Sequence, residues 1–282
     1  MTAPKIDPDA FSAWIGKSET IEDTLHPSQA RLMQVTLDKQ PSLQAGDALP
    51  PLWHWTYFLT GLPLGELGRD GHAAKGGFLP PIPLPRRMWA GGRLVFHSSP
   101  KLGEVLTKTS TIKNVTVKEG RSGALCFVTV EHLLKGADGL VRVTEDQNLV
   151  FREDPAPDAP SPKPSAPPEG SVASRTITPS TVQLFRYSAL TFNGHRIHYD
   201  REYCQDVEGY PGIIVHGPLI ATLLAGFAQQ QAGKELKTFN FRAVSPLFDT
   251  APFTIHTDGA GQIWAQTPDG NLAMKAEAVF EA

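Results

Sequence analysis

The sequence predicts an α+β fold of two tandem units, each a curved antiparallel sheet wrapped around a long central helix. Three observations indicate this. A proline-crowded stretch, EDPAPDAPSPKPSAPPEGSVAS, divides the 282-residue chain near its middle. Helical and strand patterns follow in a similar order on both sides of it. The segment 218–232 is apolar almost all round, as a helix enclosed by other structure is. We therefore expect units at 1–153 and 175–282, joined by an extended linker at 154–174.

The first half begins with a helical pattern and continues with strands. Residues 26–38, HPSQARLMQVTLD, have helical spacing, and Ser28 is the expected N-cap. A stretch rich in loop signals follows and includes FLPPIPLPRRMWAGG. From Arg93 onward, four segments alternate apolar or β-branched residues with polar ones: GRLVFHSSP, EVLTKTSTIKNVTVKEG, ALCFVTVEHLLKG and LVRVTEDQNLVFRE. They predict antiparallel strands with one buried face.

The second half repeats this order more briefly. A helix should begin near Thr178 or Ser180, and Pro218 suits the first turn of a second helix in VHGPLIATLLAGFAQQQA. The remaining segments TFNFRAV, PFTIHTDG, QIWAQTPDG and LAMKAEAVFEA have strand patterns. A buried helix followed by a curved antiparallel sheet is what a hot-dog fold requires. The chain is therefore expected to be a double hot-dog whose two sheets join into one continuous antiparallel surface.

Composition and charge argue against several classes of protein. A formal net charge of -3 and a pI of about 6.3 do not suit a nucleic-acid partner or an anionic membrane surface. No apolar run reaches the roughly eighteen residues of a spanning helix, and the N-terminus does not resemble a secretory signal. Cys126 and Cys204 favour a reduced cytosolic pair. We expect a cytoplasmic monomer or homodimer, because one chain already supplies both halves of the usual hot-dog dimer.

The stretch with most chemical content is YSALTFNGHRIHYDREYCQDVEGYPGIIVHGPL, residues 187–219. It gathers histidines, glycines and polar groups directly ahead of the apolar helix. The first N–H groups of a helix are unpaired and favour negative charge, so they could stabilise a thioester carbonyl that gains charge. The spacing of His195 and His198 also occurs in metal sites. No acidic or cysteine ligand stands at a suitable spacing nearby, so no metal is expected.

Part of this stretch, ALTFNGHRIHYD, resembles the motif apolar-Ser-Gly-Asp-x-Asn-Pro-x-His-x-Asp of the MaoC-like dehydratase and hydratase-2 superfamily. In that alignment Thr191 takes the place of Ser, Asn193 of Asp, His195 of Asn and Arg196 of Pro. His198 and Asp200 match the motif. Val215-His216-Gly217 corresponds to a later Leu-His-Gly. With PPLWHWTYFL and DGHAAKGGFLPPIPLPRRMWAGG, the resemblance covers nearly all of the chain outside the linker and extreme N-terminus. It is closest to the branch of itaconyl-CoA/3-methylfumaryl-CoA hydratases and type-2 hydroxyacyl-thioester dehydratases.

The resemblance implies a hydro-lyase with its catalytic groups in the second half. In the superfamily an aspartate and a histidine activate water, and the glycine amide helps to form the oxyanion hole. Here Asn193 cannot accept a proton from water, so His198 is the expected base, Asn193 would hold the water, and the Gly217 N–H would polarise the thioester carbonyl. No cofactor is implied beyond the CoA thioester substrate. The first half lacks an FNGHRIH counterpart and is expected to be non-catalytic.

The substrate that the resemblance implies is a short, branched, dicarboxylic enoyl-CoA, either itaconyl-CoA or 3-methylfumaryl-CoA, hydrated to citramalyl-CoA. The alternatives are an (R)-3-hydroxyacyl-thioester dehydratase, a hot-dog thioesterase and a non-catalytic acyl-CoA binder. Seven residues are candidates for binding: Arg86 and Arg87 for the CoA phosphates, Arg196 and Arg242 for a substrate carboxylate, Trp89 for the channel wall, His195 for substrate contact or a structural bond, and His216 for bracing the loop.

Overall fold

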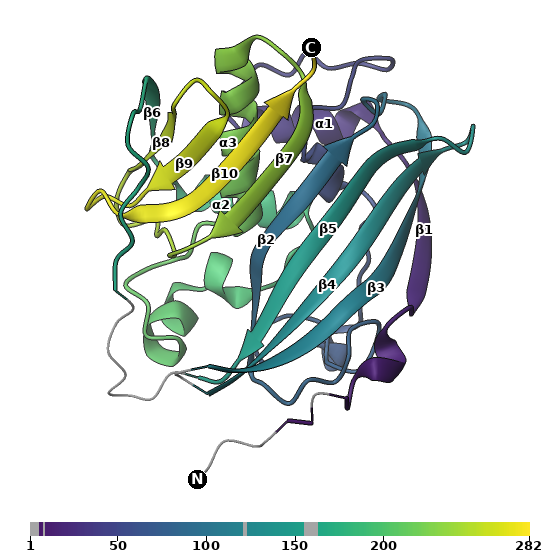
Figure 1. Ribbon diagram of the computed structural model, residues 1–282, viewed down its shortest axis with the longest axis vertical. Coiled ribbons are helices and arrows are strands. Elements are labelled where there is room, and N and C mark those ends of the chain that lie inside the picture. Colours follow the sequence, from purple (N-terminus) through teal and green to yellow (C-terminus); the bar gives the residue numbers. More distant parts are fainter. Residues whose placement is uncertain (1–5, 8, 121–122, 155–162) are drawn as a thin grey trace.

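The computed structural model describes residues 6–7, 9–120, 123–154 and 163–282. Its strands form one ten-stranded antiparallel sheet in the order β1-β3-β4-β5-β2-β7-β10-β9-β8-β6 (Figure 1). The strands are β1 (Ser18–Thr24), β2 (Arg86–Phe96), β3 (Val105–Gly120), β4 (Gly123–Gly136), β5 (Val141–Arg152), β6 (Ala173–Ile177), β7 (Leu236–Ala243), β8 (Phe253–Thr257), β9 (Gln262–Gln266) and β10 (Leu272–Phe280).

The two halves of the chain meet in the middle of this sheet. Strand β2 of the first half pairs with β7 of the second, with Gly91 opposite Arg242 and Val95 opposite Thr238. A side chain could not fit at Gly91, because an added Cβ would lie 2.3 Å from the carbonyl oxygen of Phe241. Glycine therefore permits the close approach of the two strands. The continuous antiparallel surface expected from the sequence is confirmed.

The helices lie together on one face of the sheet (Figure 1). They are α1 (Pro27–Thr36), α2 (Thr181–Leu190) and α3 (Gly217–Ala232), with short turns η1 (Ser12–Trp14), η2 (Trp53–Thr56), η3 (Leu64–Glu66), η4 (Arg196–His198) and η5 (Tyr203–Val207). Helix α3 packs on β7, β9 and β10 as the central helix of the second half. Helix α1 packs instead on α2. None of the helices in the described ranges is long and apolar enough to cross a membrane.

Two helix starts show how local sequence decides a boundary. Ser180 caps α2, and its side chain accepts a hydrogen bond from the backbone N–H of Gln183, as expected. The N-cap of α1 is His26 and not Ser28, because Pro27 already occupies the first turn. Among the described residues of the first half the longest helix is α1, which has 10 residues and is shorter than the central helix expected there. The chain leaves the helical path at Asp38, where φ is +57°.

Three further differences concern strand boundaries. Strand β2 begins at Arg86, so the arginine pair lies on a strand and not in the loop that the neighbouring prolines suggested. Strand β1 was not anticipated, because its residues SETIEDT are mostly exposed along the sheet edge. Strand β6 begins at Ala173, inside the range expected to be linker. Residues 155–162 of that range lie outside the described residues, and the unit boundaries remain a prediction.

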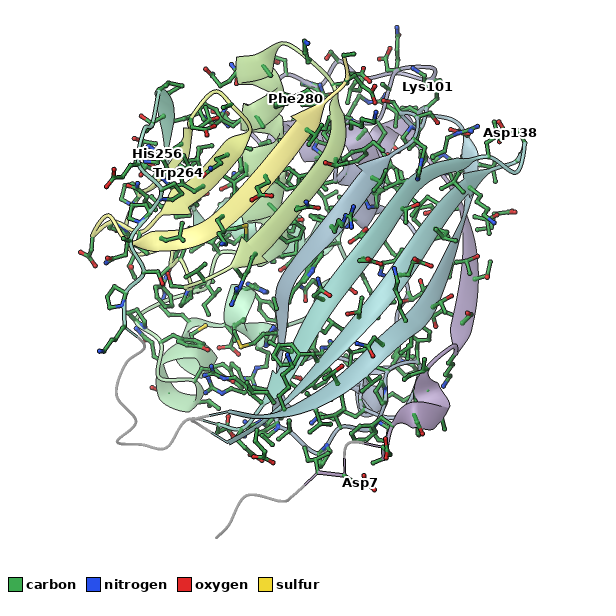
Figure 2. The ribbon with its side chains drawn as sticks, in the orientation of Figure 1. Asp7, Lys101, Asp138, His256, Trp264 and Phe280 are labelled. Atoms are coloured by element: carbon green, nitrogen blue, oxygen red, sulfur yellow. The ribbon has the colours of Figure 1, made fainter. Side chains whose placement is uncertain are left out.

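The apolar core has two parts. The larger is built around α3 and includes residues of both halves, whereas the smaller lies beneath β3, β4 and β5. On β9, Trp264 is completely buried, and its ring stacks on that of His256 on β8 with centroids 5.4 Å apart and planes inclined 9° (Figure 2). Burying α3 fixes where its N-terminus lies, and the candidate functional residues gather there.

Candidate active site

The N-terminus of α3 is the centre of the candidate site. The preceding segment is held by the Val215 N–H, which donates to the Leu247 carbonyl at 2.8 Å. The helix then begins at Gly217, with Pro218 in its first turn as expected. Among the described residues no acceptor takes the Gly217 N–H. A Cβ added to Gly217 would meet nothing within 4 Å, so the space around this donor is open.

His198 lies beside this helix start, at the end of η4, and only 7% of it is exposed. Its Nδ1 is 2.8 Å from the carbonyl oxygen of Ile214. Because a carbonyl only accepts, Nδ1 carries the proton and Nε2 keeps a free lone pair. Burial lowers the pKa of His198 to about 4, against the opposing effect of the Ile214 bond. His198 is therefore a neutral imidazole with one nitrogen able to accept a proton.

His216, the N-cap of α3, supports His198 from behind. It is completely buried, and its ring stacks on that of His198 with centroids 3.8 Å apart. Its Nε2 is 2.8 Å from the hydroxyl of Ser188 on α2. Burial, reinforced by His198 and His195, holds the pKa of His216 well below its usual value. Its contacts are those of a residue that braces the loop.

Asn193 shapes the loop between α2 and η4. Its side-chain oxygen accepts the backbone N–H of His195 at 3.0 Å, and its backbone N–H donates to the carbonyl of Ser188 at 2.8 Å. The oxygen expected to hold water is thus already used once within the loop. These bonds place His195, whose ring is perpendicular to that of His198, with centroids 5.4 Å apart and an interplanar angle of 88°.

Two further residues of the site come from the first half and were not singled out from the sequence. The Nδ1–H of His72 donates to the Asp70 carboxylate at 2.8 Å. The ring of His72 is 4.0 Å from that of His195, and the Asp70 carboxylate is 3.9 Å from His195 Nε2. Burial opposes ionisation of Asp70, but the bonds from His72 outweigh it and hold the pKa of Asp70 well below its usual value. Asp70 is therefore a carboxylate among neutral imidazoles.

The loop that carries Asp70 docks directly on the loop that carries His195. The Arg196 N–H donates to the Asp70 carbonyl at 2.9 Å. Gly71 has φ of +86°, and a Cβ there would lie 2.0 Å from the carbonyl oxygen of Gly194. Only glycine allows both this conformation and this approach. The first half thus contributes directly to the site. The segment DGHAAKGG contains Asp70, Gly71 and His72, but its residue spacing does not indicate that it contacts the loop that carries His195.

Comparisons with known proteins identify the family. A model described as "Hydroxyacyl-thioester dehydratase type 2" matches residues 52–249. The chain belongs to this family. It is 46% identical over 271 residues to mesaconyl-C(4)-CoA hydratase of Chloroflexus aurantiacus, covering 94% of this chain and 96% of the relative. It is 27% identical over 244 residues to the mitochondrial hydroxyacyl-thioester dehydratase type 2 of Schizosaccharomyces pombe, covering 77% and 80%.

Solved structures agree on the fold. A MaoC-like dehydratase matches with a TM-score of 0.70 at 14% identity over 97% of this chain and 100% of that one. A double-hotdog protein of Mycobacterium tuberculosis matches with a TM-score of 0.57 at 12% identity over 94% and 95%. The double hot-dog prediction is confirmed. As a type 2 dehydratase family member, the protein is a lyase of the hydratase and dehydratase class.

Arg86 makes structural contacts. Its guanidinium pairs with Asp154 at 2.7 Å and Glu208 at 2.9 Å, and it donates to the Tyr210 hydroxyl at 3.2 Å. These bonds tie β2 to the segment that follows η5. The three partners already use most of its donors, which leaves little for a CoA phosphate.

Arg87 faces the opposite way, into the site. It is paired across the sheet with Phe151, whose side chain belongs to the buried core. Burial lowers the pKa of Arg87, and Asp70 partly offsets this. Within the described part of the chain its guanidinium makes no hydrogen bond or ion pair. A wide cleft is lined by Arg87 and His72 together with His195, His198 and Gly217. Arg87 is thus a cation available to an anionic ligand.

The other two arginines differ in their relation to the cleft. Arg196 pairs with Asp200 at 2.7 Å, and its guanidinium lies 4.2 Å from the ring centroid of Tyr203. Arg242 is exposed on β7, where it alternates with the buried Phe241, and it also lines the cleft. Arg87 therefore lines the same cleft as His198, whereas Arg196 is paired with Asp200.

Trp89 joins an aromatic cluster beside the cleft. Its ring is 4.8 Å from that of Trp55 and 6.0 Å from that of Phe241. Its Nε1–H donates to the Gly91 carbonyl at 2.9 Å, so its polar edge is satisfied. Trp89 is partly buried and lines the cleft, as expected of a channel wall.

No acidic residue stands at a metal-ligand spacing from His195 in the sequence, but Asp70 of the first half lies near His195 in the structure. Ligand atoms of Asp70, His72 and His195 lie within 4.8 Å of one another, a grouping that could hold a metal ion. Arg87 also acts electrostatically on both histidines. A guanidinium at this position disfavours a divalent cation and suits an anion.

Proposed function

We propose that the protein adds water across the double bond of a short, branched, carboxylated enoyl-CoA, itaconyl-CoA or 3-methylfumaryl-CoA, to give a citramalyl-CoA. The observation that carries this is the tautomer of His198. Its Nδ1–H is held by the Ile214 carbonyl, so Nε2 is free as a base beside the start of α3. A positioned neutral imidazole next to unpaired helix amides supplies what thioester hydration requires.

The reaction follows from these groups. In 3-methylfumaryl-CoA, whose double bond is conjugated with the thioester, Nε2 of His198 takes a proton from water while the water oxygen bonds to the β-carbon. The π electrons move toward the thioester, whose carbonyl oxygen becomes an enolate oxygen and accepts the Gly217 N–H. His198 then returns the proton to the α-carbon, which restores both the thioester and the neutral imidazole. Asn193 keeps His195 in place through the bond to its backbone N–H.

Arg87 supports a substrate with a free carboxylate. A guanidinium pairs strongly with a carboxylate, and this one has no partner among the described residues. The relative at 46% identity is named for an acyl group with a free carboxylate, mesaconyl-C(4)-CoA. A long apolar acyl chain would leave Arg87 unpaired against hydrocarbon, which costs free energy.

The test uses two substrates that differ in one group. In 3-methylcrotonyl-CoA a methyl group replaces the free carboxylate of 3-methylfumaryl-CoA. We expect a product heavier by one water from 3-methylfumaryl-CoA or itaconyl-CoA, and turnover of 3-methylcrotonyl-CoA lower by roughly ten- to a hundredfold in kcat/KM. Arg87→Gln should remove most of this preference while changing kcat/KM for 3-methylcrotonyl-CoA little.

The same assay decides the alternatives. The family is named for the dehydration of hydroxyacyl thioesters. If the protein prefers to dehydrate uncharged (R)-3-hydroxyacyl thioesters, the proposal of a dicarboxylic substrate is wrong. Release of free CoA without water addition would indicate a thioesterase. Tight acyl-CoA binding with neither reaction would indicate a non-catalytic binder.

A further inference from the structure

Four histidine rings from both halves of the chain form a continuous row across the site. The centroid of His216 is 3.8 Å from that of His198, which is 5.4 Å from that of His195, which is 4.0 Å from that of His72. The row begins in the core at the start of α3. It ends at Asp70, which accepts the Nδ1–H of His72 at 2.8 Å. We call these residues the histidine row.

Asp70 is the carboxylate at the open end of this row. It accepts two bonds from His72, one from the ring and one from the backbone N–H at 3.1 Å. Asp70 is the carboxylate that acts electrostatically on His72 and His195, the two histidines at this end of the row. The cations Arg87 and Lys75 also face this group. Asp70 is thus a negative charge, beside His72 and His195, that can compensate a proton added to the row.

Such compensation is needed because of where the base lies. His198 is almost completely buried, and burial disfavours its charged form. When it takes a proton from water, an imidazolium forms beside the stacked His216. Asn193 carries no charge that could stabilise this cation, whereas a carboxylate in a low-dielectric site acts over several ångströms.

We propose that Asp70 and His72 are positioning residues of the active site, which orient His195 and supply the negative charge that stabilises the imidazolium formed on His198. This rests on the proposed hydration. It also means that the first half of the chain is required for the chemistry and not only for the walls of the cleft.

Asp70→Asn tests the charge without changing the shape. We expect kcat to fall by roughly tenfold or more with KM nearly unchanged, because the charge acts on the base and not on substrate binding. Removing a negative charge lowers the pKa of a nearby imidazole, so the acid limb of kcat/KM should move to lower pH. Asp138→Asn is the control. Asp138 is an exposed first-half carboxylate paired with Arg142, in the turn between β4 and β5 (Figure 2).

A purely structural role would give a different result. Asp70→Asn would then lower the yield of folded protein or raise KM, while the acid limb stayed where it is in the wild type. That outcome would overturn the proposal, as would equal rates for the wild type and Asp70→Asn. Loss of activity on treatment with a chelator, restored by zinc, would also overturn it, because Asp70, His72 and His195 would then be metal ligands.

Nitrogen-15 NMR of the wild type at neutral pH provides a readout that needs no substrate. His72→Gln identifies the His72 signals. We expect His72 to be neutral with its proton on Nδ1, since Asp70 holds that proton. A proton on Nε2 would refute the pairing even if the enzyme were an active hydratase. Conversely, an Nδ1–H tautomer in a protein that hydrates none of the enoyl-CoAs would locate the failure in the proposed function.

Discussion

The rings of His198 and His216 are stacked, with centroids 3.8 Å apart and planes inclined 16°. Each ring has one nitrogen committed to a neighbour, His198 to the Ile214 carbonyl and His216 to the Ser188 hydroxyl. Two stacked imidazoles cannot both be charged at this distance without strong repulsion. The stacked pair therefore carries at most one added proton. This suits a base that takes up and returns one proton in each catalytic cycle.

Buried neutral histidines make the protein sensitive to acid. The pKa of His198 is lowered in the folded state to about 4, whereas an unfolded histidine titrates near its usual 6.5. Between these values the unfolded chain binds the proton more tightly, so stability is full above pH 6.5 and is lost as the pH falls toward 4. For His198 alone the loss is on the order of 3 kcal/mol.

Urea unfolding at several pH values measures this loss. His198→Gln should show a shallower decline in the free energy of unfolding between pH 6.5 and pH 4 than the wild type. An unchanged slope would mean that His198 titrates normally in the folded protein.

The oxyanion donor can be tested by two substitutions at one position. Gly217→Pro removes the N–H, and proline is tolerated in a first helical turn. The preceding His216 has φ of -57° and ψ of 128°, a conformation compatible with a following proline. We expect kcat to fall about a hundred- to a thousandfold.

Gly217→Ala is the matched control, because it keeps the N–H and its Cβ would meet nothing within 4 Å. It should retain most of the wild-type rate. Equal losses for the two variants would show that the N–H is not the donor.

The docking of the two loops predicts an unusual cost for one methyl group. Gly71→Ala should abolish most activity, because its Cβ would lie 2.0 Å from the Gly194 carbonyl oxygen and push the loops apart. Gly139→Ala is the control, since Gly139 has a similar φ of +78° but open space around it. The Gly139→Ala variant introduces backbone strain without a steric clash, so it should lower the melting temperature with little change in kcat. Similar activity in the two variants would contradict the docking.

Local patterns predicted the second half of the chain well. The apolar run of α3, the Ser180 cap of α2 and the strands β7 to β10 follow from signals within a few residues of each position. The same reasoning missed β1, whose polar residues have no strand alternation. It also misplaced the start of β2, because the prolines before Arg86 resembled a longer loop.

The residues of the candidate site also fall into those that local sequence could predict and those that it could not. His198, His195 and Gly217 lie within or just after one motif and could be found from it. Asp70 and His72 are more than a hundred residues earlier, and only the joining of β2 to β7 and the docking of the two loops bring them to His195. Arg87 and Arg86 are adjacent in sequence and both line the cleft, but alternation along β2 places them differently, and only Arg86 reaches Asp154 and Glu208. Such placement depends on tertiary structure.

The most direct test of the account is His198→Gln, assayed beside the wild type on 3-methylfumaryl-CoA across the pH range. The variant should fold, keep its affinity for acyl-CoA, and lose about two to four powers of ten in kcat, because a positioned general base is gone. In the wild type, activity should persist through mildly acidic pH and decline as the pH approaches the lowered pKa of His198, about 4. If the folded variant retains more than about a tenth of wild-type turnover, His198 is not the base and the proposed chemistry is wrong.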